Sequence, residues 1–287
     1  MSSVDTPTLN SWEQAVSWLR DQPDNQKLVV DAYYDDPLEG AAMRFWQSDE
    51  WATTRALMDG RTGGAALDIG AGRGIASYAL ARDGWQVTAL EPDSSNLVGA
   101  GAIRQLAEEA NLAIQVEQTI SERLPFVDGQ FDLVYGRAVL HHIGDLSTAC
   151  AEIARVLKPG GMFIAAREHV ISSAADLPAF LTAHPLHSLY GGENAHQLGF
   201  YEAAIRNGGL QLQNSLGPLE SAINYAPHSF DSLIGEIAAR AKRVPLGAPM
   251  VKAMLGMPLF GRVALQILQK FDNRPGRHYS FVAVKPQ

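Results

Sequence analysis

The sequence predicts an α/β fold with a doubly wound, mostly parallel sheet and helices on both of its faces. Two observations support this prediction. Segments with strand and helix patterns alternate through the middle of the chain, which is typical of a parallel sheet. An apolar run at 66–69 leads into a glycine-rich turn and then into a helical segment, as a strand–turn–helix unit requires.

Residues 11–62 precede the first strand and show helical patterns. Ser11 can cap a helix whose apolar side chains recur at helical spacing, and Pro23 and Pro37 interrupt the pattern further on. Aromatic side chains follow up to Trp51. We expect them to pack onto the main domain.

Seven strands and the helices between them follow in order. The strands are predicted at 65–70, 86–91, 112–117, 131–136, 161–167, 210–216 and 278–284. The helices are predicted at 73–83, 95–109, 146–157, 199–207 and, with proline interruptions, 229–270. Ligands of such sheets bind outside the carboxyl ends of the strands. Four residues near those ends are therefore expected to converge on one crevice: Gly70, Glu91, Gly136 and Arg167.

The glycine-rich turn has the sequence GAGRG at 70–74. Glycine tolerates positive φ and lets a ligand approach the main chain closely. A dinucleotide fingerprint has its third glycine one position later, where this chain has Ile75. By itself the turn is compatible with a nucleotide-type ligand and with a tight turn that binds nothing.

Glu91 ends the strand after this turn, 17 residues beyond Gly74. A βαβ unit places a carboxylate close to this position, where it accepts hydrogen bonds from ribose hydroxyls. A solvated acid at a strand end is the alternative. We favour the ribose interpretation because Glu91 is in register with the glycine turn.

Three further blocks follow in order, with the sequences LPFVDGQFDLVY at 124–135, LHHI at 140–143 and EIARVLKPGG at 152–161. Together with 66–75 they resemble the class I S-adenosylmethionine (SAM)-dependent methyltransferases, in the ubiquinone/menaquinone-biosynthesis-like branch called type 11. The resemblance covers about 66–167. It implies a Rossmann-like sheet of seven strands, SAM as the cofactor and S-adenosyl-L-homocysteine as the product.

The resemblance also implies a domain organisation. Residues 1–62 would form an N-terminal helical lid, with aromatic side chains on its inner face. Residues 63–287 would form the SAM-binding methyltransferase domain. Acceptor-binding insertions are expected at about 169–198 and 225–275, the second of them helical.

For the cofactor, the resemblance implies backbone contacts from Gly70, Ala71 and Gly72 to the methionine part of SAM. Asp68 would lie beneath the ammonium group, or would only brace the turn. Arg137 follows the fourth strand. It would face the cofactor carboxylate, or would pair with an acid of a helix.

Pro92 and Asp93 would flank the adenine. Relatives often carry an aspartate four residues before the leucine of the LPF block, where this chain has Ile120. The backbone of Ser121 and the side chain of Glu122 are therefore the expected adenine contacts.

His141 is the favoured general base for the acceptor. An imidazole ordinarily has a pKa of about 6.5, which suits proton removal at neutral pH. The LHH sequence resembles the catalytic-histidine position of small-molecule O-methyltransferases, although many type 11 relatives keep this pair without an assigned base. His142 and Glu168 are the other candidates, and a structural role is the alternative for each.

A polar, glycine-rich segment after the fifth strand is expected to line the acceptor pocket. The substrate-binding candidates are His169, His187, Tyr190 and Glu193, with His184 and His196 in the same group. Loop histidines without a firm spacing more often line a pocket than bind a metal ion. We therefore predict no metal and keep ligation by this group as the alternative.

The formal net charge of −8 argues against nucleic-acid binding, which needs a positive surface. From Asp231 onward nine Lys/Arg oppose three Asp/Glu, which would suit an acidic partner or acceptor, or a solvated basic face. The single cysteine, Cys150, excludes a disulfide framework and a multi-cysteine metal site. We expect it to be a small buried side chain.

Residues 1–10 show no signal-peptide pattern, and no window is apolar enough for a membrane span. These features predict a soluble, cytoplasmic protein. Residues 250–271 mix apolar and basic side chains, as a membrane-surface helix does. Prolines and glycines interrupt them, so we favour a helix pair that covers the pocket. The oligomeric state is not predicted.

Taken together, the residues and the resemblance predict methyl transfer from SAM to a small-molecule acceptor, most readily an oxygen nucleophile. One alternative is a SAM-binding partner or sensor protein without catalysis. Another is a nicotinamide oxidoreductase, which Ile75 and the later blocks argue against.

Overall fold

The structure is a computed structural model that describes residues 9–240, 252–253, 255–256 and 258–287. Its strands are β1 (Ala65–Ile69), β2 (Gln86–Leu90), β3 (Ile114–Glu117), β4 (Phe131–Arg137), β5 (Leu157–Ile171), β6 (His196–Gln197), β7 (Gln211–Leu216) and β8 (Arg277–Val284). Its α-helices in the described ranges include α1 (Trp12–Asp21), α2 (Gln26–Asp31), α3 (Leu38–Trp46), α4 (Asp49–Leu57), α5 (Ile75–Arg82), α6 (Ala100–Glu109), α7 (Leu146–Val156), α8 (Leu177–Ala183), α9 (Pro185–Tyr190), α10 (Leu198–Asn207), α11 (Ala222–Tyr225), α12 (Phe230–Arg240) and α14 (Pro258–Leu268).

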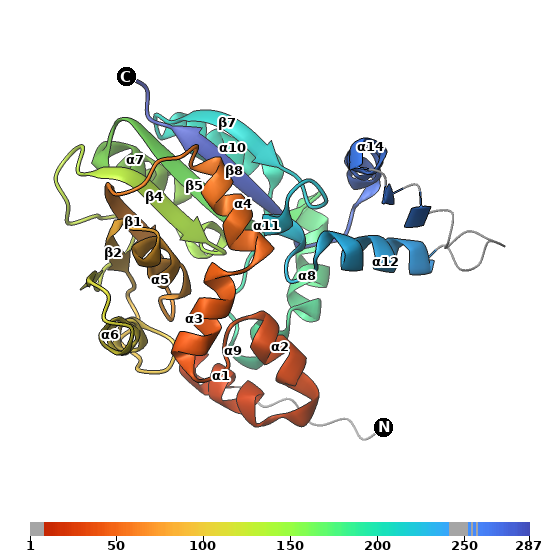
Figure 1. Ribbon diagram of the computed structural model, residues 1–287, viewed down its shortest axis with the longest axis horizontal. Helices are drawn as coiled ribbons and strands as arrows, with labels where there is room; N and C mark the ends of the chain where they lie inside the picture. The colour runs from red at the N-terminus through yellow and green to blue at the C-terminus, as the bar shows by residue number, and fades with distance from the viewer. Residues whose placement is uncertain (1–8, 241–251, 254, 257) are drawn as a thin grey trace.

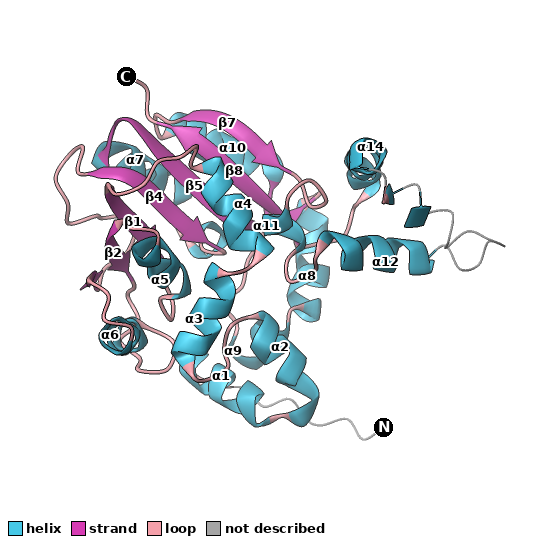
Figure 2. Cartoon of the chain, in the orientation of Figure 1, coloured by secondary structure: helices cyan, strands magenta, loops and turns pink. Residues whose placement is uncertain are grey.

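The strands form one eight-stranded sheet in the order β3-β2-β1-β4-β5-β8-β7, with β6 paired to β5 beside this path (Figure 2). Neighbours from β3 to β5 pair in parallel, while β8 runs antiparallel to both β5 and β7. The predicted doubly wound, mostly parallel sheet is confirmed, with each of its seven strands present. The two-residue β6 is an addition.

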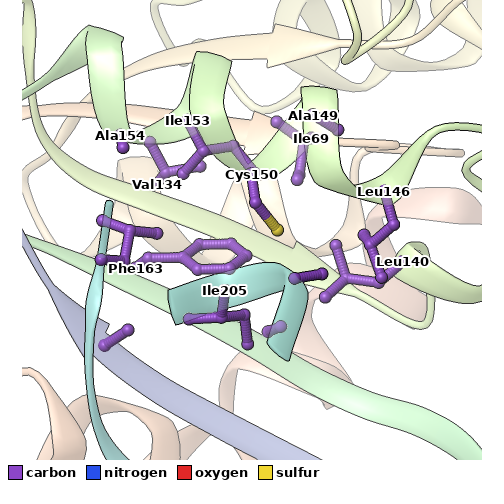
Figure 3. Close-up of a cluster of buried hydrophobic side chains, with 14 of the residues drawn as sticks. Ile69, Val134, Leu140, Leu146, Ala149, Cys150, Ile153, Ala154, Phe163 and Ile205 are labelled. Carbon is purple, nitrogen blue, oxygen red and sulfur yellow. The ribbon is translucent and has the colours of Figure 1, made fainter. Parts of the chain in front are cut away.

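Alternate residues of the strands enter two cores on opposite faces of the sheet, because side chains alternate along a strand. Leu67 belongs to the core under α7 and α10, and Ala66 belongs to the core under α3, α4 and α5. Figure 3 shows the first core, where Cys150 packs among aliphatic and aromatic side chains. Cys150 is fully buried, as predicted, and burial raises the pKa of its thiol to about 12.

The N-terminal helices α1 and α2 lie beside α9, at the end of the molecule away from β7 (Figure 1). Ser11 caps α1, as predicted, by accepting a hydrogen bond from the backbone N–H of Gln14. Leu19, Val29 and Leu189 then pack together in a small core of their own. Side chains of the segment before β1 therefore pack against a side chain of the segment after β5.

Strand β5 extends beyond the predicted 161–167 and ends at Ile171. A bulge between Ala165 and Glu168 interrupts its pairing with β8, and Arg167 there has a φ of 61°. A bulge bends a strand and redirects side chains without ending it. Glu168 therefore lies within β5, together with the histidine that follows it, and not just past the strand as predicted.

The chain beyond β7 is helical in α11, α12 and α14, and α12 and α14 project to one side of the sheet (Figure 1). Of the predicted stretch 250–271, residues 250, 251, 254 and 257 lie outside the described residues. In the described ranges, no helix is both long and apolar enough to cross a membrane.

Candidate active site

A cavity of about 1030 Å³ lies at the carboxyl ends of the parallel strands. Gly70, Glu91 and Arg167 line it, as predicted. Gly136 does not line it, because Ile69 and Val139 occupy the space where its side chain would be. Ligand pockets commonly measure about 300–1,000 Å³, so this cavity has room for a cofactor and a second small molecule.

The turn after β1 places the N-terminus of α5 at the cavity wall. Gly70 has a φ of 59°, and a Cβ atom there would lie 2.2 Å from Cγ2 of Val139. Gly74 precedes α5 with a φ of 85°, and its Cβ would lie 3.2 Å from Cγ2 of Ile103. Both positions therefore need glycine for backbone conformation and for close packing.

Glu91 fixes this turn to the end of β2. Its carboxylate accepts hydrogen bonds from the backbone N–H of Gly72, at 2.7 Å, and of Asp93, at 2.9 Å. Burial raises the pKa of Glu91 to about 7, although the two hydrogen bonds act in the opposite direction. The carboxylate is thus held at the wall where the predicted ribose contact needs it.

Asp68 lies at the end of β1 and is almost completely buried. It accepts a hydrogen bond from the hydroxyl of Ser77 at 2.6 Å, and burial raises its pKa to about 7. Through Ser77 it braces the first turn of α5, which was one of its two predicted roles. It also lines the cavity beside Ala71 and Gly72, so the predicted cofactor contact stays open to test.

The residues predicted to contact the adenine lie along one part of the wall. Pro92, Ser121 and Glu122 line the cavity together with Ile120, whose side chain is exposed. Asp93 does not line it. Its backbone N–H instead contributes to the hydrogen bonds that hold the neighbouring carboxylate.

Arg137 lines the cavity, but an acid already engages its guanidinium. Nε and Nη2 donate to the two carboxylate oxygens of Glu50 in α4, at 2.7 and 3.1 Å. Burial lowers the pKa of Arg137, but the Glu50 carboxylate raises it by more. The predicted pairing with a helix acid is therefore present. Sequence patterns did not identify Glu50, because it lies 87 residues away in the chain.

Arg73 is a cavity residue that sequence reasoning missed. Its buried guanidinium donates to the carbonyl oxygen of Tyr33 at 2.9 Å and to the carboxylate of Asp36 at 2.6 Å. It thereby ties the glycine turn to the segment between α2 and α3. Its place inside the GAGRG turn was the available signal. Trp12 and Tyr34 of the same N-terminal region also line the cavity.

At the end of the cavity beside β4 and β5, across the sheet order from β2, His141 and Glu168 form a buried pair. Nδ1 of His141 lies 2.7 Å from Oε2 of Glu168, whose carboxylate also accepts hydrogen bonds from the backbone N–H of Val139 and of His141. Glu168 is fully buried and does not line the cavity. The prediction of Glu168 as a base is therefore corrected: it positions the imidazole.

His141 has a pKa far from the value that its predicted role assumed. Burial alone lowers its pKa, but the carboxylates of Glu168 and Glu193 outweigh burial and raise it to about 9. The imidazole therefore keeps its proton at neutral pH. A group in this state must first lose that proton before it can act as the predicted base.

Glu193 lies among three histidines. Its carboxylate oxygens are 3.6 Å from Nε2 of His141, 3.8 Å from Nε2 of His142 and 3.7 Å from Nδ1 of His184. Burial raises the pKa of Glu193, but the histidines lower it by more, to about 2. This predicted acceptor residue thus brings a negative charge to the cavity wall.

His142 and His169 also line the cavity. Nδ1 of His169 lies 3.0 Å from the carbonyl oxygen of Gly276, and burial lowers the pKa of His169 to about 3. Nδ1 of His142 lies 3.0 Å from the carbonyl oxygen of Gly192, and burial lowers its pKa as well. Burial thus favours the neutral form of both imidazoles.

Tyr190 lines the cavity, and burial raises its pKa to about 12. His187 does not line the cavity, contrary to its predicted role. In α9 the residues that line the cavity are Pro185, Leu186 and Tyr190. His196 also lies outside the wall, with its ring 4.5 Å from that of Phe200.

Comparisons with known proteins agree with this geometry. Residues 67–165 match the family model described as "Methyltransferase domain". Over 104 residues the chain is 36% identical to a dimethylglycine N-methyltransferase from Parasynechococcus marenigrum (strain WH8102), covering 36% of each protein. Over 104 residues it is 38% identical to a ubiquinone biosynthesis O-methyltransferase from Methylobacterium sp. (strain 4-46), covering 35% of this chain and 39% of that protein. The chain thus spans about two fifths of these relatives' own length.

Among solved structures, the fold is similar to that of geranyl diphosphate C-methyltransferase from Streptomyces coelicolor A3(2), in complex with Mg²⁺, geranyl diphosphate and S-adenosyl-L-homocysteine. The TM-score is 0.55 at 17% identity, and the match covers 89% of this chain and 88% of that one. At this identity the likeness concerns the fold. The matched family, the sheet and the glycine turn agree on SAM as the cofactor. Residues 67–165 therefore form a methyltransferase domain of the class I SAM-dependent kind, in the type 11 branch.

Proposed function

We propose that this chain transfers the methyl group of SAM to an oxygen atom of a small-molecule acceptor. The observation that carries the proposal is a single cavity that joins the glycine turn and Glu91 at one end to His141 and Glu193 at the other. A donor bound at the first end and an acceptor bound at the second would meet inside this cavity.

Methyl transfer from a sulfonium is an in-line displacement. The acceptor oxygen forms a bond to the methyl carbon while the sulfur–carbon bond breaks and the sulfur keeps the electron pair. Positioning can supply about 7–11 kcal/mol of the barrier at the well-oriented limit. In this proposal the described residues before β1, which contribute Trp12 and Tyr34 to the wall, form a lid that excludes water.

The acceptor end supports an oxygen nucleophile over an amine. A hydroxyl must lose a proton during the transfer, whereas a neutral amine reacts through its lone pair. The imidazole of His142 lines the wall beside Glu193 and offers a proton acceptor. One of the two relatives is named an N-methyltransferase and the other an O-methyltransferase. The choice of oxygen over nitrogen as the acceptor atom therefore rests on the residues of this wall.

Two measurements test the proposal. Isothermal titration with SAM and with S-adenosyl-L-homocysteine should show one site on the full chain. Matched acceptors that differ only in a hydroxyl or an amine should then form S-adenosyl-L-homocysteine with the hydroxyl member. Transfer to the amines alone would overturn the oxygen assignment. Binding without transfer to any acceptor would favour a SAM-binding partner or sensor.

A further inference from the structure

Histidines gather in one wall of the cavity. Six of the eight histidines of the chain line it. Five of them form a connected group, named here the histidine cluster: His141, His142, His169, His184 and His278. Neighbouring rings in the cluster have centroids 4.2 to 5.4 Å apart. These residues come from four separate segments of the chain, so local helix or loop geometry does not account for their meeting.

Two buried carboxylates accompany the cluster. The side chain of Glu168 is 0% exposed and that of Glu193 is 5% exposed. In the described ranges, every ion-pair partner of these two carboxylates is a histidine. Buried charge is costly unless an opposite charge compensates it. One dication, bound with release of the proton that His141 otherwise holds, would balance both carboxylates.

Three potential metal ligands already converge. His141, His169 and Glu193 each place one ligand atom within 4.8 Å of the others. Nε2 of His141 is 3.6 Å from Oε2 of Glu193. Two ligands about 2.1 Å from one tetrahedral zinc ion lie about 3.4 Å apart, so this pair needs almost no movement. Any other pair of these ligand atoms would close by at most about 1.4 Å, which side-chain rotation can supply.

The hydrogen bonds behind the cluster orient two histidines as ligands. Nδ1 of His141 faces the carboxylate of Glu168, and Nδ1 of His169 faces the carbonyl oxygen of Gly276. These oxygens can only accept, so each Nδ1 carries a proton and each Nε2 is the coordinating nitrogen. Metal-binding histidines almost always donate their other N–H to a carboxylate or a carbonyl in this way.

His184 provides an independent indication that an ion binds at this cluster. Its Nδ1 is buried and has no hydrogen-bond partner in the part of the chain that the structure describes. It lies 3.7 Å from Oε1 of Glu193, which is beyond hydrogen-bonding distance. A buried polar nitrogen without a partner is unfavourable, and coordination to an ion would satisfy it.

We propose that His141, His169 and Glu193 bind one divalent transition-metal ion, with His184 in reach as a fourth ligand. Two imidazoles and a carboxylate suit zinc, iron or cobalt, whereas magnesium and calcium prefer oxygen ligands throughout. Three protein ligands leave coordination positions for a ligand from the cavity. This proposal replaces the expectation of no metal with its alternative, ligation by the histidine group.

The metal site also narrows the class of acceptor, and this step rests on the proposed function. A hydroxyl that binds a dication loses its proton more easily, and the proton leaves to solvent. The resulting alkoxide or phenolate attacks the methyl carbon of SAM. The sulfur–carbon bond breaks, and neutral S-adenosyl-L-homocysteine leaves. The expected acceptors carry a hydroxyl that can ligate a metal.

Metal binding can be measured without catalysis. Full-length protein freed of metal by a chelator is titrated with Co²⁺, followed by visible absorption, and with Zn²⁺, followed by calorimetry. We expect one ion per chain. His169→Gln and Glu193→Gln should each weaken binding at least about 100-fold, and Glu168→Gln about 10- to 100-fold. His187→Gln is the matched control, because this histidine neighbours the cluster in sequence but lies outside the cavity wall, and it should bind like the wild type.

SAM titration of each protein separates the two proposals. Wild-type protein that takes up no stoichiometric Co²⁺ or Zn²⁺ overturns the metal site, and so does binding that survives in both His169→Gln and Glu193→Gln. If circular dichroism shows that either variant is unfolded, the other variant decides. Stoichiometric metal binding without SAM binding would support the site and remove the proposed function.

Discussion

The two ends of the cavity are built in different ways. One short stretch of backbone makes the cofactor end, where the turn after β1 is held by the carboxylate of Glu91. The acceptor end collects side chains from distant segments: His141 after β4, His169 in β5, Glu193 before β6 and His278 in β8. Backbone conformation defines the first end, and side-chain chemistry defines the second.

This contrast has a functional meaning. A site formed by main-chain geometry suits a ligand that a whole family shares, because every member with the same fold has the same site. A site formed by side chains can change its chemistry while the fold stays the same. Substitutions at one end should therefore leave the other end working.

The largest effect is expected at the cofactor end. Glu91→Ala removes the proposed partner of the ribose hydroxyls and leaves the N–H groups of Gly72 and Asp93 without their acceptor. Hydrogen bonds to a charged group contribute about 1.5–3 kcal/mol each, so SAM affinity should fall about 100-fold or more by calorimetry. Glu117→Ala, at the exposed end of the adjacent strand, is the control and should bind SAM normally. Equal affinity in the two variants would remove Glu91 from the site.

The next effect belongs to the acceptor end. Glu168→Gln keeps the size of the side chain but removes the charge that orients His141. We expect kcat to fall about 10- to 100-fold while the Kd for SAM stays within about twofold. Steady-state kinetics and calorimetry on the same preparation give both numbers. A parallel loss of SAM affinity would show that the two ends are not separable.

A smaller effect should appear with pH. Burial raises the pKa of Glu91 to about 7, and only its ionised form can accept hydrogen bonds from both ribose hydroxyls. SAM affinity should therefore rise as pH increases, by up to about tenfold between pH 6 and pH 8. Asp68, whose pKa is also raised to about 7, is the second group in this range. Calorimetry at several pH values on the wild type, Glu91→Gln and Asp68→Asn shows which carboxyl group causes the change of SAM affinity with pH. A wild-type affinity that does not change with pH would contradict the prediction.

The smallest effect tests the proposed lid. Trp12 lines the cavity, and its ring lies 3.4 Å from the position of a Cβ atom on Gly72. Trp12→Ala should weaken SAM binding about 3- to 10-fold through lost apolar contact. Trp18→Ala removes the same side chain from the same helix outside the cavity wall, where it packs on the small core of α1, α2 and α9. If both variants lose the same affinity, the effect comes from helix packing and not from a lid.

The cofactor end was readable in the sequence because its determinants are local. The turn at 70–74 and Glu91 lie within one strand–helix–strand unit, and the spacing between them follows from that unit alone. The strands were predictable for a similar reason. Parallel strands covered on both faces carry continuous apolar runs, as Ala66 to Ile69 does around Asp68.

The acceptor end was predicted only in part because it depends on pairing between distant strands. The bulge beside Arg167 lets β5 continue, and antiparallel pairing then aligns His169 with His278. Periodicity shows no sign of such a bulge. The candidate residues His141 and Glu193 were named correctly as cavity residues, but their approach to 3.6 Å requires the folded chain.

A crystal structure with S-adenosyl-L-homocysteine bound would show directly which residues hold the cofactor. The homocysteine part should lie against the turn at 70–74, the ribose hydroxyls should bind the carboxylate of Glu91, and the sulfur should point toward the end of the cavity that holds His141 and Glu193. A ligand whose ribose contacts other residues, or whose sulfur points away from that end, would contradict this prediction.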